Sequence, residues 1–203
     1  LDASQYYDFA GGGLTQLGVA TDIGRVNFKN AMAELGDQAT AKTQGEFVSA
    51  FMNVSRLQNL NGPKTQIYAA LQAQYSPDNL DSAQQFSVGG ASNIAGYNNS
   101  ALSGSTGYYI LSELRQSLYA SAQNQLTAKI YVDTATVKHQ AREWSGLTGK
   151  NIEQISSAGF GLNWSNAMQW QAALTVGFPI GSQPDSVDKR NDVEAWLNVS
   201  KRF

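Results

Sequence analysis

The 203-residue sequence predicts an all-β fold, an antiparallel transmembrane β-barrel, and three observations lead to this fold class. Apolar and polar residues alternate along nine segments, as expected of strands with one apolar and one polar face. The polar faces carry Gln, Asn, Lys, Asp and Thr, whereas a soluble sandwich turns one face of each strand into a dry core. Short and long connections also alternate, as in barrels with short turns at one end and long loops at the other.

The elements follow from this period-two pattern, taken in chain order. The nine candidate strands are residues 1–9, 14–28, 46–57, 67–75, 107–118, 126–137, 155–164, 169–180 and 193–203. Segment 67–75 shows the alternation clearly, because Ile67, Leu71 and Tyr75 lie opposite Gln72 and Gln74. Residues 31–36 have a helical composition, but the segment is short and flanked by loop residues, so we expect no stable helix there.

The connections and the aromatic residues fit the same fold. Residues 59–64 and 165–168 are tight turns, whereas 82–106, 139–154 and 181–192 are long. Aromatic side chains gather at strand ends, as in the girdles at the two membrane interfaces of a barrel. They are Tyr108, Tyr109, Tyr119, Trp164, Trp170 and Phe178. A soluble all-β protein with polar surface faces remains the alternative.

The last strand carries a further signal. Val193, Leu197 and Val199 share one face, and the chain closes on Phe203. A terminal aromatic after such a strand is typical of the assembly signal of bacterial outer-membrane barrels. We therefore expect Phe203 to address the chain to the barrel-assembly machinery. Lys201 departs from the pattern, because an apolar residue is expected there.

Composition excludes several classes of function. Fourteen basic and sixteen acidic residues give a net charge of −2, which argues against a nucleic-acid partner. There is no cysteine, hence no disulfide or thiol nucleophile. The sequence has no run of about 18 apolar residues, which a membrane-spanning helix would need. The chain does not begin with Met and no leader precedes Leu1, so we expect it to be processed or cut from a longer protein.

The long connection and the strand after it carry four short sequence motifs in succession. Residues 80–90 read LDSAQQFSVGG, residues 93–97 read NIAGY, residues 103–107 read SGSTG, and residues 112–115 read SELR. This order resembles the TpsB transporters of two-partner secretion, in which LDSSEQFSLGG precedes VRGY or VRAY, SGDxG and ELR. The similarity covers nearly the whole chain, through GEF at 45–47, SRLQ at 55–58, QYS at 74–76, YVD at 131–133, GFGLNWS at 159–165 and KRF at 201–203.

The resemblance implies an outer-membrane pore of about sixteen strands preceded by two periplasmic POTRA domains, which this chain lacks. Loop 82–106 is expected to fold into the lumen while an unfolded partner exoprotein (TpsA type) is threaded outward. Residues 1–203 would then supply the later strands. Bacterial barrels close with even strand numbers. The nine segments therefore indicate either about seven missing earlier strands or a trimmed barrel of eight or ten.

The same resemblance supplies candidate functional residues. The loop motif comprises Gly89, Gly90, Ile94, Ala95, Gly96 and Tyr97, and the lumen wall that faces the loop comprises Glu113, Arg115, Lys129, Tyr131 and Asp133. In relatives an Arg at the loop tip pairs with an Asp in an aromatic-x-Asp-x-Gly motif. Here Ala95 replaces that Arg and Ala135 replaces the Gly, through natural divergence or an engineered change. We therefore expect Asp133 to be held by water, Lys129 or Arg115.

Other polar residues support weaker hypotheses. Glu113 and Arg115 form either a rack that seats the loop or a water-lined wall. His139 is the single histidine and is expected to be an ordinary loop residue. Gly89 and Gly90 lack a following P-loop lysine, which favours backbone bending over phosphate binding.

No enzyme, cofactor or metal is predicted, although a calcium site is a minor alternative at the loop carboxylates. These are Asp78, Asp81, Asp185 and Asp188. Two functions besides a protein-translocating pore stay open: a simple diffusion porin or structural barrel without dedicated cargo, and a soluble domain that binds sugars or partners.

Overall fold

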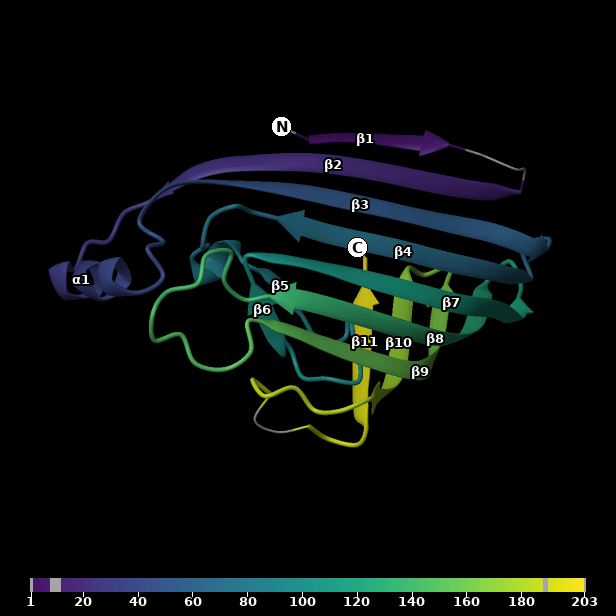
Figure 1. Ribbon diagram of the computed structural model, residues 1–203. Helices are drawn as coiled ribbons and strands as arrows, with labels where there is room; N and C mark the ends of the chain where they lie inside the picture. Colours follow the sequence, from purple (N-terminus) through teal and green to yellow (C-terminus); the bar gives the residue numbers. More distant parts are fainter. Residues whose placement is uncertain (1, 8–11, 188–189, 203) are drawn as a thin grey trace.

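The computed structural model describes residues 2–7, 12–187 and 190–202, and most of them form one antiparallel sheet (Figure 1). The sheet has nine strands in the order β1-β2-β3-β4-β7-β8-β9-β10-β11. Their bounds are β1 Asp2–Tyr7, β2 Gly13–Val26, β3 Gly45–Asn61, β4 Thr65–Tyr75, β7 Thr106–Ala120, β8 Asn124–Lys138, β9 Ile152–Asn166, β10 Trp170–Ile180 and β11 Glu194–Lys201. Each predicted strand corresponds to one of these, so the predicted antiparallel all-β architecture is confirmed.

The sheet is open and strongly curved. Strands β1 and β11 are its two edges, and β10 and β11 run across the direction of β2–β4 in Figure 1. Across the described residues the sheet has nine strands, whereas a trimmed barrel is expected to have eight or ten. Long connections at residues 27–44, 76–105, 139–151 and 181–193 alternate with tight turns at 62–64, 121–123 and 167–169. Long and short connections therefore lie at opposite ends of the strands, as predicted.

The two faces of the sheet differ as the alternation predicts. Directly paired residues in antiparallel strands point to the same face. The convex face exposes Val19, Met52, Ile67, Leu114, Ile130, Phe160, Leu174 and Leu197. The concave face carries Gln74, Glu113, Asp133 and Ser157, which are buried beneath the long connection 76–105. An exposed apolar face opposite a covered polar face is the pattern of a barrel wall in lipid.

One prediction about helices is wrong. Helix α1, Ala31–Ala39, lies between β2 and β3, where we expected none. The Asn30 side chain accepts a hydrogen bond from the Met32 amide at 2.9 Å and caps the helix N-terminus. At the other end Asp37 accepts hydrogen bonds from the amides of Thr43 and Gln44 at 2.8 and 2.9 Å. These local bonds stabilise a segment that its length alone would leave marginal. No helix in the described ranges is long and apolar enough to cross a membrane.

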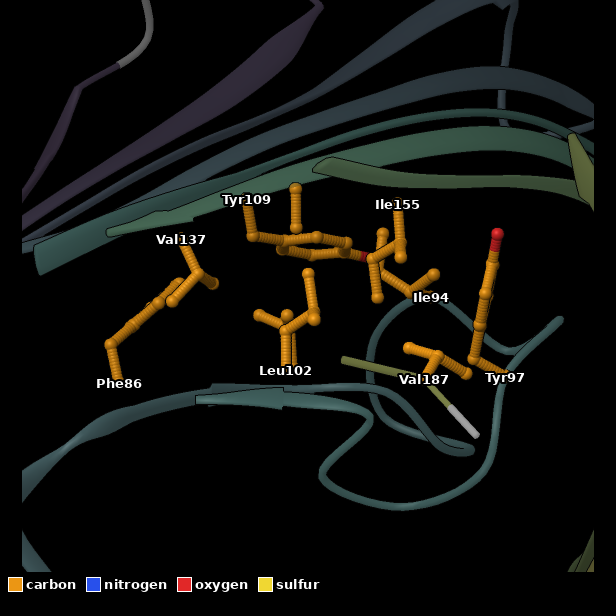
Figure 2. Close-up of a cluster of buried hydrophobic side chains, with 10 residues drawn as sticks. Phe86, Ile94, Tyr97, Leu102, Tyr109, Val137, Ile155 and Val187 are labelled. Atoms are coloured by element: carbon orange, nitrogen blue, oxygen red, sulfur yellow. The ribbon is translucent and has the colours of Figure 1, made fainter. Parts of the chain in front are cut away.

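The long connection is also more ordered than its composition indicates. It contains a 3₁₀ turn, Ser82–Gln84, and a two-stranded hairpin of β5, Phe86–Val88, and β6, Leu102–Gly104. Apolar side chains of this connection, of the concave face and of the connection between β10 and β11 meet in one buried cluster (Figure 2). Its members are Phe86, Val88, Ile94, Tyr97, Leu102, Tyr109, Ala135, Val137, Ile155 and Val187. The concave face thus has an apolar core of its own, which the alternation did not predict.

Candidate functional site

The candidate site is the contact between the tip of connection 76–105, residues 93–97, and the concave face of the sheet, which forms the wall beneath it. Ser105 fixes the base of the connection, because its amide donates to the His139 carbonyl at 3.1 Å. Its hydroxyl accepts from the Leu80 amide at 3.0 Å, and its carbonyl accepts from the Gln74 side chain at 3.3 Å. Both limbs of the connection are thereby tied to the wall at the end of the strands, and the tip extends inward between them.

Two glycines with positive φ shape the limb of the connection that precedes the tip. Gly89 and Gly90 have φ values of +116° and +105°, so both lie where side chains are strained. A Cβ at Gly89 would lie 2.3 Å from the Asn98 carbonyl oxygen. The Asn93 side chain accepts from the Gly89 amide at 2.8 Å and closes the turn. The two glycines therefore bend the backbone ahead of the tip.

The tip touches the wall through Asp133. The buried Asp133 carboxylate accepts from the Ser157 hydroxyl at 2.5 Å and the Ser157 amide at 3.2 Å. The backbone N–H of Ile94, at the tip, interacts electrostatically with the same carboxylate. One carboxylate thus joins β8, β9 and the loop. Ile94 has φ +46°, a strained value for a β-branched residue, which the docked contacts must hold.

The tip backbone also lies directly on β10 and β11. A Cβ added at Gly177 would lie 2.4 Å from the carbonyl carbon of Ala95, and one at Gly96 would lie 2.8 Å from the Pro179 nitrogen. The Trp196 indole N–H donates to the Ala95 carbonyl at 2.8 Å. Glycine on both sides of the contact therefore permits a backbone-to-backbone approach that any larger residue would prevent.

The remaining wall residues pair mainly with one another. Glu113 is buried and binds Arg115 Nη2 at 2.6 Å and Lys129 Nζ at 3.0 Å. The Arg115 guanidinium stacks 4.2 Å from the centre of the Tyr68 ring. The Tyr131 hydroxyl donates across β9 to the Val176 carbonyl at 3.2 Å.

A cavity of about 40 Å³ separates this charged cluster from the tip. Ala95, Glu113, Lys129, Tyr131 and Asp133 all line it. Five of the predicted residues therefore line one cavity. Two of them, Glu113 and Lys129, also form a salt bridge between strands β7 and β8.

Two of the three expected partners of Asp133, Lys129 and Arg115, are not its hydrogen-bond partners. Lys129 and Arg115 both bind Glu113 directly, so neither is a direct hydrogen-bond partner of Asp133. The hydroxyl and the amide of Ser157 bind Asp133 instead. The physical reason is that backbone amides and a hydroxyl satisfy a buried carboxylate as well as a cation can.

Sequence reasoning missed Ser157, Gly177 and Trp196. Gly177, a glycine at an inward position of its strand, was the available signal, since it marks where another backbone approaches closely. Gly159 and Gly161 instead leave room for the Tyr131 and Lys129 side chains. Phe203, the predicted assembly signal, lies outside the described residues.

Comparisons with known proteins identify the family. Residues 7–164 match the family model described as haemolysin secretion/activation protein ShlB/FhaC/HecB. The chain belongs to this family. Members of this TpsB-type family are outer-membrane secretion proteins, and they are transporters rather than enzymes.

Curated relatives and a solved structure agree with this placement in the ShlB/FhaC/HecB family. Two heme/hemopexin transporter proteins HuxB from Haemophilus influenzae are 27% and 26% identical over 134 residues, 66% of this chain. The chain spans 23% of the length of each. The structure of CdiB from Escherichia coli superimposes with a TM-score of 0.76 and 20% identity, over 96% of this chain and 34% of CdiB. This likeness shows that the sheet has the fold of part of that barrel.

Proposed function

We propose that residues 1–203 form the later strands of an outer-membrane pore that moves an unfolded partner exoprotein to the cell surface. The observation that carries the proposal is the two-faced sheet: an apolar convex face suited to lipid, and a polar concave face suited to an aqueous lumen. An extended chain passing through such a lumen can exchange its backbone hydrogen bonds with water and with polar wall residues. The cargo is a secreted exoprotein of the TpsA type.

Connection 76–105 acts in this proposal as a plug or guide within the pore. Its apolar cluster and the contacts of Trp196 with Ala95 and of Gln74 with Ser105 hold it on the concave face. The wall residues Glu113, Lys129 and Tyr131 line the cavity beside the tip, and Arg115 pairs with Glu113. A docked tip narrows the lumen, and its displacement widens it.

The proposal also includes two partners outside the chain. The apolar convex face contacts the lipid bilayer, and the last strand with Phe203 addresses the barrel-assembly machinery. Replacing Phe203 with Ala should then lower the amount of folded protein in the outer membrane, measured by the gel shift between boiled and unboiled samples.

The alternative function is a diffusion porin or structural barrel without dedicated cargo. The ordered contacts between the connection and the wall favour the translocating pore, because a plain pore needs no segment so specifically fastened in its lumen.

Deleting residues 90–103 from the intact outer-membrane protein tests the proposal. Removing the tip should raise single-channel conductance in planar bilayers and change secretion of the partner exoprotein from cells. A matched deletion of residues 143–150, in the connection between β8 and β9, should leave conductance unchanged. Unchanged conductance with normal secretion after the first deletion would contradict the plug or guide role. Normal outer-membrane folding without secretion of any partner by the unmodified protein would support the porin.

A further inference from the structure

His139 lies just after β8 and joins three segments of the protein. Its Nδ1 lies 2.7 Å from the carbonyl oxygen of Ser103, on the return limb of connection 76–105. Its Nε2 lies 2.9 Å from Oε2 of Glu153, near the start of β9. The other carboxylate oxygen of Glu153 accepts from the Ser186 amide, in the connection between β10 and β11, at 3.1 Å. The imidazole therefore bridges the return limb to the wall.

Both ring nitrogens face hydrogen-bond acceptors. A carbonyl oxygen and a carboxylate oxygen can only accept, so each contact requires an N–H on the ring. A neutral imidazole carries one N–H and would direct the lone pair of its other nitrogen at an oxygen. The imidazolium carries both and makes both bonds. It also supplies a positive charge to Glu153, whose side chain is only 3% exposed.

We propose that His139 is a positioning residue whose protonated form clamps the return limb of connection 76–105 to the barrel wall. This inference rests on the proposed plug or guide role of the connection. It assigns the docked state to the imidazolium: docking is tightest when His139 carries two protons, and it weakens as pH rises and one proton leaves. Histidine is the side chain that ordinarily changes charge between about pH 5 and 8.

The other charged groups near His139 do not change the assignment of the docked state to its protonated form. Across the described residues, the charged groups that line the same cavity of about 480 Å³ are Glu153, Lys150 and Asp185. Lys150 and Asp185 pair with each other at 3.1 Å and are both more than half exposed. They offset each other in solvent. Glu153 is the carboxylate that contacts the ring directly, and the return limb supplies the neutral Ser103 carbonyl.

A buried cysteine can report whether the connection is docked. The 203 residues contain no cysteine, and Ala135 lies fully buried on the wall beneath the connection. An Ala135→Cys variant of the intact protein, with no other reactive cysteine, should react with a membrane-impermeant maleimide only when the connection lifts. Each rate is divided by the rate for the same protein in denaturant at the same pH, which removes the titration of the thiol itself.

The decisive variant is Glu153→Gln, because it separates a proton-dependent clamp from a merely structural one. Its amide NH₂ replaces the Oε2 position and donates to Nε2, while Oε1 still accepts from the Ser186 amide. A neutral His139 then satisfies both contacts. With Glu153 in place, the normalised rate should rise about tenfold or more between pH 6 and pH 9, the loss of one hydrogen bond to a charged group. In Glu153→Gln the rate should stay low and flat.

Two further variants complete the test. His139→Ala should react rapidly at every pH, and the matched control Lys150→Gln should keep the full pH dependence. A flat profile with Glu153 in place, or an unchanged slope in Glu153→Gln, would overturn the clamp. These readouts are independent of secretion, so the clamp can fail while deletion of residues 90–103 still changes conductance. Conversely, the pH dependence can hold while the pore proves to carry no protein.

Discussion

The anchor of the loop tip can be tested by replacing Asp133 with Asn. Both Ser157 contacts go to the same carboxylate oxygen, Oδ1. An asparagine whose carbonyl oxygen occupies that position keeps both of them and changes little in volume. What it loses is the negative charge with which the Ile94 amide interacts at the tip. The substitution therefore weakens the tip contact while leaving the contact between β8 and β9 in place.

The magnitude follows from the kind of bond that is lost. A hydrogen bond to a charged group contributes about 1.5–3 kcal/mol, roughly twice the value for neutral partners. With this range as the upper limit for the Ile94 interaction, its loss should raise the undocked population by up to about 150-fold, since about 1.4 kcal/mol corresponds to a factor of ten. The strained φ of Ile94 acts in the same direction, because undocking releases it.

The assay is maleimide labelling of the Ala135→Cys reporter in the intact protein at one fixed pH. Asp78→Asn is the matched control, because Asp78 pairs with the largely exposed Arg142. Exposed pairs contribute about 0–1 kcal/mol, so this variant should change the rate less than about fivefold. If Asp133→Asn labels no faster than this control, Asp133 does not anchor the tip.

Three further predictions address the tip, the membrane face and the helix. Gly177→Ala places a Cβ against the loop backbone and should raise labelling about 5- to 150-fold, the effect of about 1–3 kcal/mol of overpacking, whereas Gly36→Ala, with open space around it, should not. Leu197→Lys on the exposed apolar face should cost up to about 2–4 kcal/mol of stability in bilayers, measured by urea titration in vesicles, and Asn198→Lys on the inner face should cost less. Burial acts to raise the pKa of Asp37, but its hydrogen bonds outweigh burial and hold the pKa below its ordinary value. The connection that carries α1 is therefore stabilised above the ordinary Asp pKa and should lose protease protection as pH falls through the lowered value; equal protection at neutral and strongly acidic pH would refute this.

Several features of the fold were predictable from the sequence. The alternation of Ile67, Leu71 and Tyr75 with Gln72 and Gln74 assigned both faces of β4 correctly, because side chains in a strand alternate with a period of two. The motifs in residues 80–115 identified the family, and the family model confirmed it. Helix α1 was missed because its stability comes from capping bonds across several residues rather than from a long periodic pattern.

The site was predicted in part. The sequence predicts both Asp133 and Ala95 as functional residues, and the structure places both in the lining of one cavity. The partners of Asp133 were not predicted, because Ser157 and Ile94 lie 24 and 39 positions away in the sequence and carry no local signal. The sequence predicts that His139 is an ordinary loop residue, because no nearby residue indicates that both ring nitrogens meet acceptors on other segments.

The sequence by itself determined which segments are strands, which side of each is apolar, and to which family the chain belongs. These properties depend on neighbouring residues and on the order of motifs, both of which are written along the chain. Only the tertiary structure decided how connection 76–105 crosses the concave face and which side chains hold it there. That path depends on the curvature of the sheet and on backbone contacts at glycines, which bring together residues that no local pattern connects.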